Sequence, residues 1–257
     1  MRLSGFAGQT AIVTGAAGGI GQAVTRALLE AGARVTAADT EAALAANPPP
    51  PGATAAALDV RDGAALEALV SQTEARLGPL ALGVHAAGIL SIGPLLDLQP
   101  EEWERVIGVN TTGSFNTLRA FGRAMVRHGR GSIVTVSSNA AALPRMNMGA
   151  YAASKAAVTM LVRCLGLELA GQGVRCNIVA PGSTLTPMQT GMWADQAANG
   201  ERAVIEGNLE SYRTGIPLKK LATPEDVSDA VMFLLSDQAG HITMADIFVD
   251  GGATLRA

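Results

Sequence analysis

Tyr151 and Lys155 are the residues whose types and spacing most directly suggest chemistry. They lie four positions apart in the segment YAASK, and if residues 149–170 form a helix, both side chains share one face. A free tyrosine has a pKa of about 10, too high for a base at neutral pH. A neighbouring ammonium stabilises the phenolate. We therefore expect a lowered tyrosine pKa and a group that takes the proton of an alcohol as hydride leaves.

Ser138 extends this pair. It follows an expected buried strand at residues 131–137 and precedes the helix that carries the pair. Its hydroxyl could hydrogen-bond the oxygen of a substrate. A tyrosine and a lysine at this spacing are also common on ordinary surface helices, so the chemical interpretation depends on the rest of the chain.

A glycine-rich segment, TGAAGGIG, lies between an expected strand at residues 10–13 and an expected helix at residues 19–32. Glycines there allow a tight turn and the close approach of a pyrophosphate, whose charge would meet the amides of the helix start. Some strand-to-helix turns carry such glycines for structural reasons alone, but here both flanks have the form that a dinucleotide site requires. The expected cofactor residues in this turn are Gly15, Gly18, Gly19, Ile20 and Gly21.

Asp39 supports a dinucleotide site from the end of the next expected strand, residues 34–38. A carboxylate at this place can accept hydrogen bonds from both hydroxyls of the adenosine ribose. It would also repel a 2′-phosphate, and the following Thr40 offers no cation in compensation. The expected cofactor is therefore NAD rather than NADP, and the alternative is a solvated loop aspartate.

The elements that must position these residues alternate along the whole chain. Further helices are expected at residues 62–77, 100–126 (one or two helices) and 224–235, and further strands at residues 80–85, 174–179 and 247–249. Four consecutive prolines make residues 47–52 a surface loop, and residues 187–215, with Trp193 and Tyr212, are interpreted as an irregular, mobile segment that covers the substrate. The alternation predicts one α/β domain over residues 1–257, a doubly wound Rossmann fold with a parallel sheet of about seven strands and helices on both faces.

Composition excludes several classes of protein. Apolar residues make up 48% of the chain and charged residues 16%, which is typical of a globular protein. The net charge of −3 and the scattered cations argue against nucleic acid. No stretch approaches the ~20 apolar residues of a membrane helix. Cys164 and Cys176 are expected to be free buried thiols rather than a disulfide, with no metal site, so a cytoplasmic protein is predicted.

Several further short motifs occur in order along the chain, and together with those above they resemble the short-chain dehydrogenase/reductase family from about residue 8 to the end. They are Asp59-Val60, Ala86-Ala87-Gly88, Asn110 and Pro181-Gly182. The resemblance implies that Asn110 holds a water in a proton relay from Lys155 to solvent, and that Lys155 also bonds the nicotinamide ribose.

The same resemblance implies the remaining cofactor contacts and the assembly. Asp59 and Val60 would contact adenine, Ala87 and Gly88 would let the backbone approach the cofactor, and residues 181–186 would meet the carboxamide. The last set comprises Pro181, Gly182, Thr184 and Thr186. Members are usually homotetramers, with the two long helices forming one interface. His85 stands where the family often has asparagine. We expect it to be a hydrogen-bonded residue at the edge of the core.

Segments in the C-terminal half of the chain carry a second resemblance. Residues 138–151, 167–184 and 241–252 are similar to the 2,3-dihydro-2,3-dihydroxybenzoate dehydrogenases of catechol siderophore synthesis. In such a reaction, oxidation of a ring alcohol gives a dienone that becomes aromatic by tautomerisation. Arg145 could clamp the substrate carboxylate through two hydrogen bonds, or it could be a surface arginine. Other candidates for the substrate site are Ser138, Gln189 and a methionine wall of Met146, Met148, Met188 and Met192, for which core filling is equally plausible.

Three alternatives stay open. Thr190 stands where the resembling enzymes are expected to have arginine, which allows a variant ring such as trans-2,3-dihydro-3-hydroxyanthranilate, as in antibiotic biosynthesis. A 3-oxoacyl-carrier-protein reductase would usually prefer NADPH, which Asp39 and Thr40 disfavour. A non-catalytic NAD sensor often lacks the tyrosine or the lysine, whereas both Tyr151 and Lys155 are present here.

Overall fold

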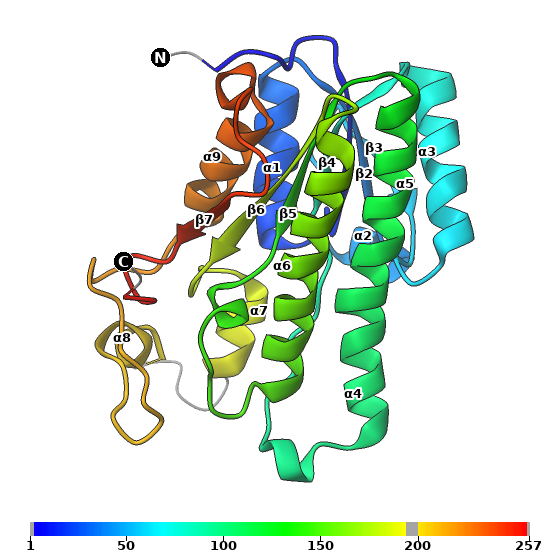
Figure 1. Ribbon diagram of the computed structural model, residues 1–257. Helices are drawn as coiled ribbons and strands as arrows, with labels where there is room; N and C mark the ends of the chain where they lie inside the picture. Colours follow the sequence, from blue (N-terminus) through cyan, green and yellow to red (C-terminus); the bar gives the residue numbers. More distant parts are fainter. Residues whose placement is uncertain (1–2, 194–199, 256–257) are drawn as a thin grey trace.

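The structure is a computed structural model that describes residues 3–193 and 200–255. Its strands are β1 (Thr10–Thr14), β2 (Arg34–Asp39), β3 (Thr54–Ala57), β4 (Leu80–His85), β5 (Gly131–Val136), β6 (Val174–Pro181) and β7 (Asp246–Val249). They form one parallel seven-stranded sheet in the order β3-β2-β1-β4-β5-β6-β7 (Figure 1). This confirms the predicted doubly wound α/β fold. The strand order reverses between β1 and β4, where ligands bind at the carboxyl ends of such sheets.

Helices cover both faces of this sheet. On one face lie α1 (Gly19–Glu30) and α9 (Pro224–Leu235), and on the other lie α3 (Gly63–Leu77), α5 (Gly113–Arg127) and α6 (Gly149–Ala170) (Figure 1). A π-helical turn (Ile107–Thr112) joins α4 (Pro100–Val106) to α5. Three short helices complete the chain: α2 (Glu41–Ala46), α7 (Pro187–Thr190) and α8 (Gly200–Glu206).

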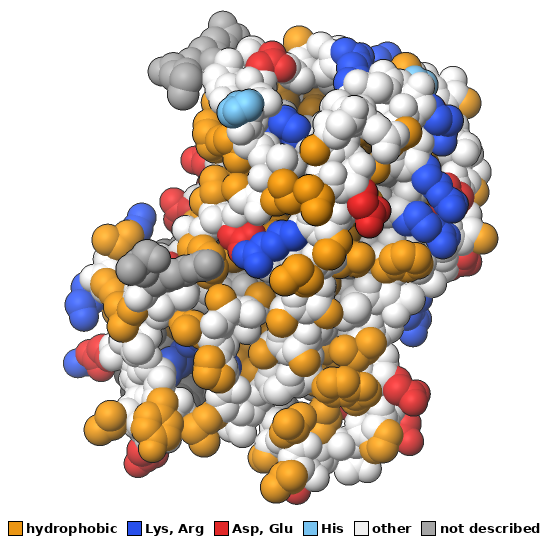
Figure 2. Space-filling view, in the orientation of Figure 1, with side chains coloured by type: hydrophobic (Ala, Val, Ile, Leu, Met, Phe, Trp, Pro, Cys, Tyr) orange, Lys and Arg blue, Asp and Glu red, His pale blue; other side chains and the backbone are white. Residues whose placement is uncertain are grey.

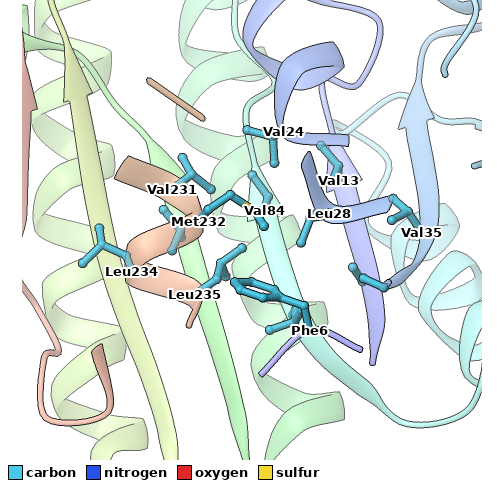
Figure 3. Packing of buried hydrophobic residues seen from close by; sticks show 14 of the residues in the cluster. Phe6, Val13, Val24, Leu28, Val35, Val84, Val231, Met232, Leu234 and Leu235 are labelled. Carbon is cyan, nitrogen blue, oxygen red and sulfur yellow. The ribbon is translucent and has the colours of Figure 1, made fainter. Parts of the chain in front are cut away.

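Two apolar layers hold the helices on the sheet. Val13 and Val84, from the central strands, pack with Leu28 of α1 and Val231 of α9 in the first layer (Figure 3). Every residue of β1 and β4 is buried, as expected for parallel strands covered on both faces. In the second layer, a Cβ added at Gly83 would lie 2.5 Å from the ring of Phe121. Small side chains therefore let α5 approach β4 closely.

Two segments differ from the sequence expectation. β3 was not predicted, because its sequence TAAA alternates between half-buried and exposed positions at the edge of the sheet and has no continuous apolar run. Residues 187–215 are not simply irregular, since they include α7, a 3-10 turn (Gly191–Trp193) and α8. Trp193 packs against a third small core around Val204 and Ile216, whereas Tyr212 is exposed.

α6 also corrects two expectations. By length and composition it passes for a membrane-spanning helix, although no such stretch was expected. It packs against β6 and α5 and buries Ser154 and Lys155, so it is a core helix of the fold. Cys164 on α6 is exposed rather than buried, because no described residue covers it on the outer face of the helix. Cys176 is buried, and both thiols are free.

Candidate active site

The predicted tyrosine, lysine and serine come together at the carboxyl end of the sheet. Tyr151 and Lys155 lie in the first turns of α6, and Ser138 follows β5 as the N-cap of a 3-10 turn (Asn139–Ala141). Tyr151 and Ser138 are hydrogen-bonded through their side chains. The Nζ atom of Lys155 lies 5.9 Å from the centroid of the Tyr151 ring and donates to the carbonyl of Val136 at 3.1 Å. All three functional side chains line one pocket.

Protonation at this site differs from the sequence expectation. Burial raises the pKa of Tyr151 above its ordinary value, and the hydrogen bond with Ser138 only partly opposes that effect. Burial also lowers the pKa of Lys155 to about 8. The predicted lowering of the Tyr151 pKa is therefore wrong for the protein alone, because removing the phenolate from water outweighs the stabilising contacts that surround it.

Asn110 lies in the π-helical turn and is fully buried. Its side-chain oxygen accepts from the amide of Ile89 at 2.8 Å, and its nitrogen donates to the Ile89 carbonyl at 3.0 Å. The same nitrogen donates to Ser154 Oγ at 2.9 Å, and Ser154 in turn donates to the Tyr151 carbonyl. Asn110 thus fixes the segment after Gly88 against the start of α6. Such π turns are frequent at functional sites.

His85 is satisfied at the edge of the core, as predicted. Its Nδ1 atom lies 2.8 Å from Thr14 Oγ1, and its Nε2 atom lies 2.8 Å from Ser114 Oγ. Ser114 donates its own proton to the Asn110 carbonyl, so Nε2 must carry the histidine hydrogen and Nδ1 must accept from Thr14. Burial, helped by the charge of Lys155, lowers the pKa of His85 to about 3. The neutral ring therefore ties β1 and β4 to Ser114 at the start of α5, and through Ser114 to Asn110 in the π-helical turn.

A second cavity continues from this pocket along the carboxyl end of β1 and β2. Its lining includes the predicted cofactor residues Gly15, Gly18, Gly19, Ile20, Gly21, Asp39, Thr40, Asp59, Val60, Ala87 and Gly88. A Cβ added at Gly15, where φ is +71°, would lie 2.4 Å from the Ala87 amide nitrogen, and one at Gly21 would lie 2.1 Å from the Gly15 carbonyl oxygen. The turn therefore packs too closely for any side chain at these two positions.

The charges in this cavity fit a dinucleotide. No side chain caps α1, so the amides and the positive end of the helix dipole face the cavity. Asp39 is fixed by the amides of Ala17 and Thr40, at 3.0 and 2.8 Å. Arg61 also lines the cavity, but its Nε atom is bonded to both carboxylate oxygens of Asp59, at 3.0 and 2.9 Å. The donor set and the glycine cradle therefore fit NAD or NADP.

The two cavities share Ile20, Ala86, Gly88, Thr186 and Met188, so they form one cleft. The pocket beside Tyr151 also includes predicted residues from the segment before α6, from the end of β6 and the loop after it, and from α7: Arg145, Met148, Pro181, Gly182, Thr184 and Gln189. Met146 is 56% exposed and does not line it, and the side chain of Met192 lies outside the described part. Thr190 is exposed, and its hydroxyl donates to the Pro187 carbonyl. Thr190 itself is therefore not part of the described pocket wall.

Two features of the pocket were not found from sequence. Arg213 lines it from the far end of the 187–215 segment, and no local pattern distinguishes that arginine from the others. The side-chain nitrogen of Gln189 is buried and has no hydrogen-bond partner among the residues that the structure describes. A buried donor without a partner is costly, so this one is available to a ligand in the pocket.

Comparisons with known proteins agree with this geometry. Residues 15–254 match the family described as enoyl-(acyl carrier protein) reductase. The chain is 49% identical to a 2,3-dihydro-2,3-dihydroxybenzoate dehydrogenase of Bacillus subtilis, over 99% of both chains. It is 44% identical to a vibriobactin-specific enzyme of the same name from Vibrio cholerae, over 95% of both chains. Among solved structures, the aldohexose dehydrogenase of Thermoplasma acidophilum superposes with a TM-score of 0.87 at 29% identity, covering 100% of this chain and 98% of that one.

Proposed function

Because the chain belongs to the short-chain dehydrogenase/reductase family and is an oxidoreductase that uses NAD or NADP, we propose that it oxidises 2,3-dihydro-2,3-dihydroxybenzoate with NAD. The product is 2,3-dihydroxybenzoate, a building block for siderophores or related secondary metabolites. One observation carries this proposal: Tyr151, Ser138 and Arg145 line the same pocket, and its described lining residues include no carboxylate. The ring acid itself is taken from the two bacterial relatives.

The residues of this pocket divide the chemistry between them. Tyr151 takes the proton of the ring hydroxyl, and Ser138 hydrogen-bonds the same oxygen. NAD, when bound, supplies the acceptor for the hydride. Asn110 holds a water between Lys155 and solvent, and that relay removes the proton from the site. The dienone becomes aromatic by tautomerisation, which makes the oxidative direction favourable.

The preference for NAD rests on Asp39. Its carboxylate receives the two hydroxyls of the adenosine ribose and repels a 2′-phosphate. Arg61 is a cation that lines this cavity, but it is already paired with Asp59. Asp59 and Val60 contact adenine, Lys155 bonds the nicotinamide ribose, and residues 181–186 contact the carboxamide.

Assembly, mobility and compartment belong to the same proposal. The enzyme is a cytoplasmic homotetramer in which α5 and α6 form one interface. In the predicted substrate-covering segment, 187–215, residues 194–199 lie outside the described residues. Its described parts, 187–193 and 200–215, move to admit and cover the substrate, because they contribute Met188, Gln189 and Arg213 to the pocket wall. Small anionic ring compounds are its ligands.

A substrate panel tests the proposal. The purified protein is mixed with NAD or NADP and with 2,3-dihydro-2,3-dihydroxybenzoate, trans-2,3-dihydro-3-hydroxyanthranilate or a 3-hydroxyacyl thioester, and absorbance of the reduced cofactor is followed. We expect the first acid with NAD to give the largest kcat/KM. We expect Tyr151→Phe to lower kcat by about 10²–10⁴-fold while NADH binding stays unchanged. Turnover of the thioester alone, or of no compound, would refute the proposal.

A further inference from the structure

The pocket beside Tyr151 has an unusual charge. Three cationic side chains line it, Lys155, Arg145 and Arg213, and no Asp or Glu is among its described lining residues. Neither arginine forms an ion pair with any residue in the described ranges. Half-buried guanidinium groups are normally matched by an anion within the protein. This pocket is therefore arranged for an anion that comes from outside.

From this arrangement, and building on the proposed function, we infer that Arg213 is a second ligand of the substrate carboxylate and that it shares this anion with Arg145. The inference concerns a residue of the 187–215 segment that the sequence pattern does not distinguish. It makes the carboxylate site a two-arginine site that is complete only when the hairpin at residues 208–213 is in place.

The backbone around Arg213 holds it in a defined position. Asn208 and Arg213 exchange two backbone hydrogen bonds, at 2.9 and 2.8 Å, which close a hairpin. Glycines 207 and 215 at its base have positive φ and pack tightly, since a Cβ on Gly207 would lie 2.4 Å from the Arg213 carbonyl oxygen. One guanidinium nitrogen of Arg213 donates to Ser183 Oγ at 3.0 Å. No other described residue accepts a hydrogen bond from this guanidinium, so its remaining donors are left for a ligand.

Electrostatics support the same role. Burial lowers the pKa of Arg213, and the charge of Arg145 lowers it further. Burial lowers the pKa of Arg145 as well, and Asp250 partly compensates. The Asp250 carboxylate already accepts hydrogen bonds from Asn139, Gly252 and Thr254. An anion between the two arginines would relieve their repulsion and gain charge-assisted hydrogen bonds.

The test compares charged and neutral ligands on Arg213→Gln. Binding of benzoate and of benzamide to the enzyme–NADH complex is measured by calorimetry, and KM and kcat are measured with 2,3-dihydro-2,3-dihydroxybenzoate. We expect benzoate affinity to fall at least about tenfold and the substrate KM to rise by a similar factor. Benzamide affinity and the KM for NAD should not change. Arg213→Lys keeps the charge without the forked geometry, so we expect its benzoate affinity to lie between those of the unchanged enzyme and Arg213→Gln.

Arg202→Gln is the matched control. It removes one cation from the same segment, but Arg202 is exposed on α8, pairs with Glu206 and does not line the pocket. We expect it to behave as the unchanged enzyme. Equal losses for benzoate and benzamide in Arg213→Gln would mean that Arg213 only supports the fold, and unchanged benzoate affinity would mean that it binds no anion; either result overturns the inference.

The two proposals can fail separately. If Arg213→Gln oxidises the ring acid with unchanged kcat and KM, this inference is wrong and the proposed function stands. An enzyme that never oxidises the ring acid loses the proposed function, yet the comparison of benzoate with benzamide still decides whether Arg213 and Arg145 form an anion site.

Discussion

At the scale of single residues, the protonation of Tyr151 governs how activity depends on pH. Burial raises the pKa of its hydroxyl, so below that pKa the phenolate fraction grows about tenfold per pH unit. We expect log kcat/KM for oxidation to rise with a slope near one at pH values below about 8, the pKa of Lys155, where half of its ammonium has lost the proton. Initial rates at several pH values measure the slope. If log kcat/KM does not change with pH, Tyr151 is already ionised and the prediction is wrong. The residual kcat/KM of Tyr151→Phe should not rise with pH.

The charge of Asp39 is expected to determine the preference for NAD over NADP. Asp39→Asn removes the negative charge and keeps the size of the side chain, but it leaves one acceptor oxygen where the amides of Ala17 and Thr40 each bond a carboxylate oxygen in the wild type. We expect kcat/KM with NAD to fall about tenfold and the preference for NAD over NADP to narrow, since repulsion of a 2′-phosphate is lost. Asp62→Asn is the control, because Asp62 caps α3 outside the cleft. If the ratio of kcat/KM with NAD to kcat/KM with NADP is the same in Asp39→Asn as in the unchanged enzyme, Asp39 does not determine the cofactor preference.

At the scale of elements, the turn between β1 and α1 depends on close backbone packing. A methyl group at Gly21 would lie 2.1 Å from the Gly15 carbonyl oxygen, whereas one at Gly18 would lie 3.3 Å from the same atom. We expect Gly21→Ala to lower the free energy of unfolding by about 1–3 kcal/mol and to raise the KM for NAD at least about tenfold. Denaturant titration and initial rates measure both. Gly18→Ala, at an N-cap with negative φ, should cost less than about 1 kcal/mol, and equal effects of the two would contradict the packing argument.

The elements also show which features a sequence can predict. β1 and β4 are mostly apolar and β-branched or small, so their burial between two helical layers follows from the residues themselves. β3 consists of one threonine and three alanines at half-buried and exposed positions, and it gains its place only by pairing with β2. The π-helical turn keeps a helical pattern of residues, so nothing in the periodicity marks the extra residue that presents Asn110. Such features depend on partners that are distant in the chain.

At the scale of the whole molecule, the active site was predictable where function fixes residue type and spacing. Tyr151, Ser138, Asp39 and the glycine turn lie at the carboxyl end of one sheet, as the motif order indicates. Arg213 was not predictable, because its place in the pocket depends on a hairpin closed by Asn208 and on contact with Ser183. The raised Tyr151 pKa was also beyond sequence reasoning, since it depends on how completely the fold buries the ring.

The outer faces of α5 and α6 carry the last prediction, which concerns assembly. Phe115, Met160 and Leu167 are 44%, 55% and 70% exposed there, and these helices face the viewer in Figure 2, with hydrophobic side chains distributed across that face. Exposed apolar faces of this kind mark protein interfaces. We expect the native mass to be about four times 26.1 kDa, measured by light scattering. Leu167→Glu should give smaller particles because it places charge in the interface, whereas Leu96→Glu, at a 99% exposed position outside both helices, should not. A monomeric native protein, or an unchanged mass for Leu167→Glu, would contradict the tetramer through this face.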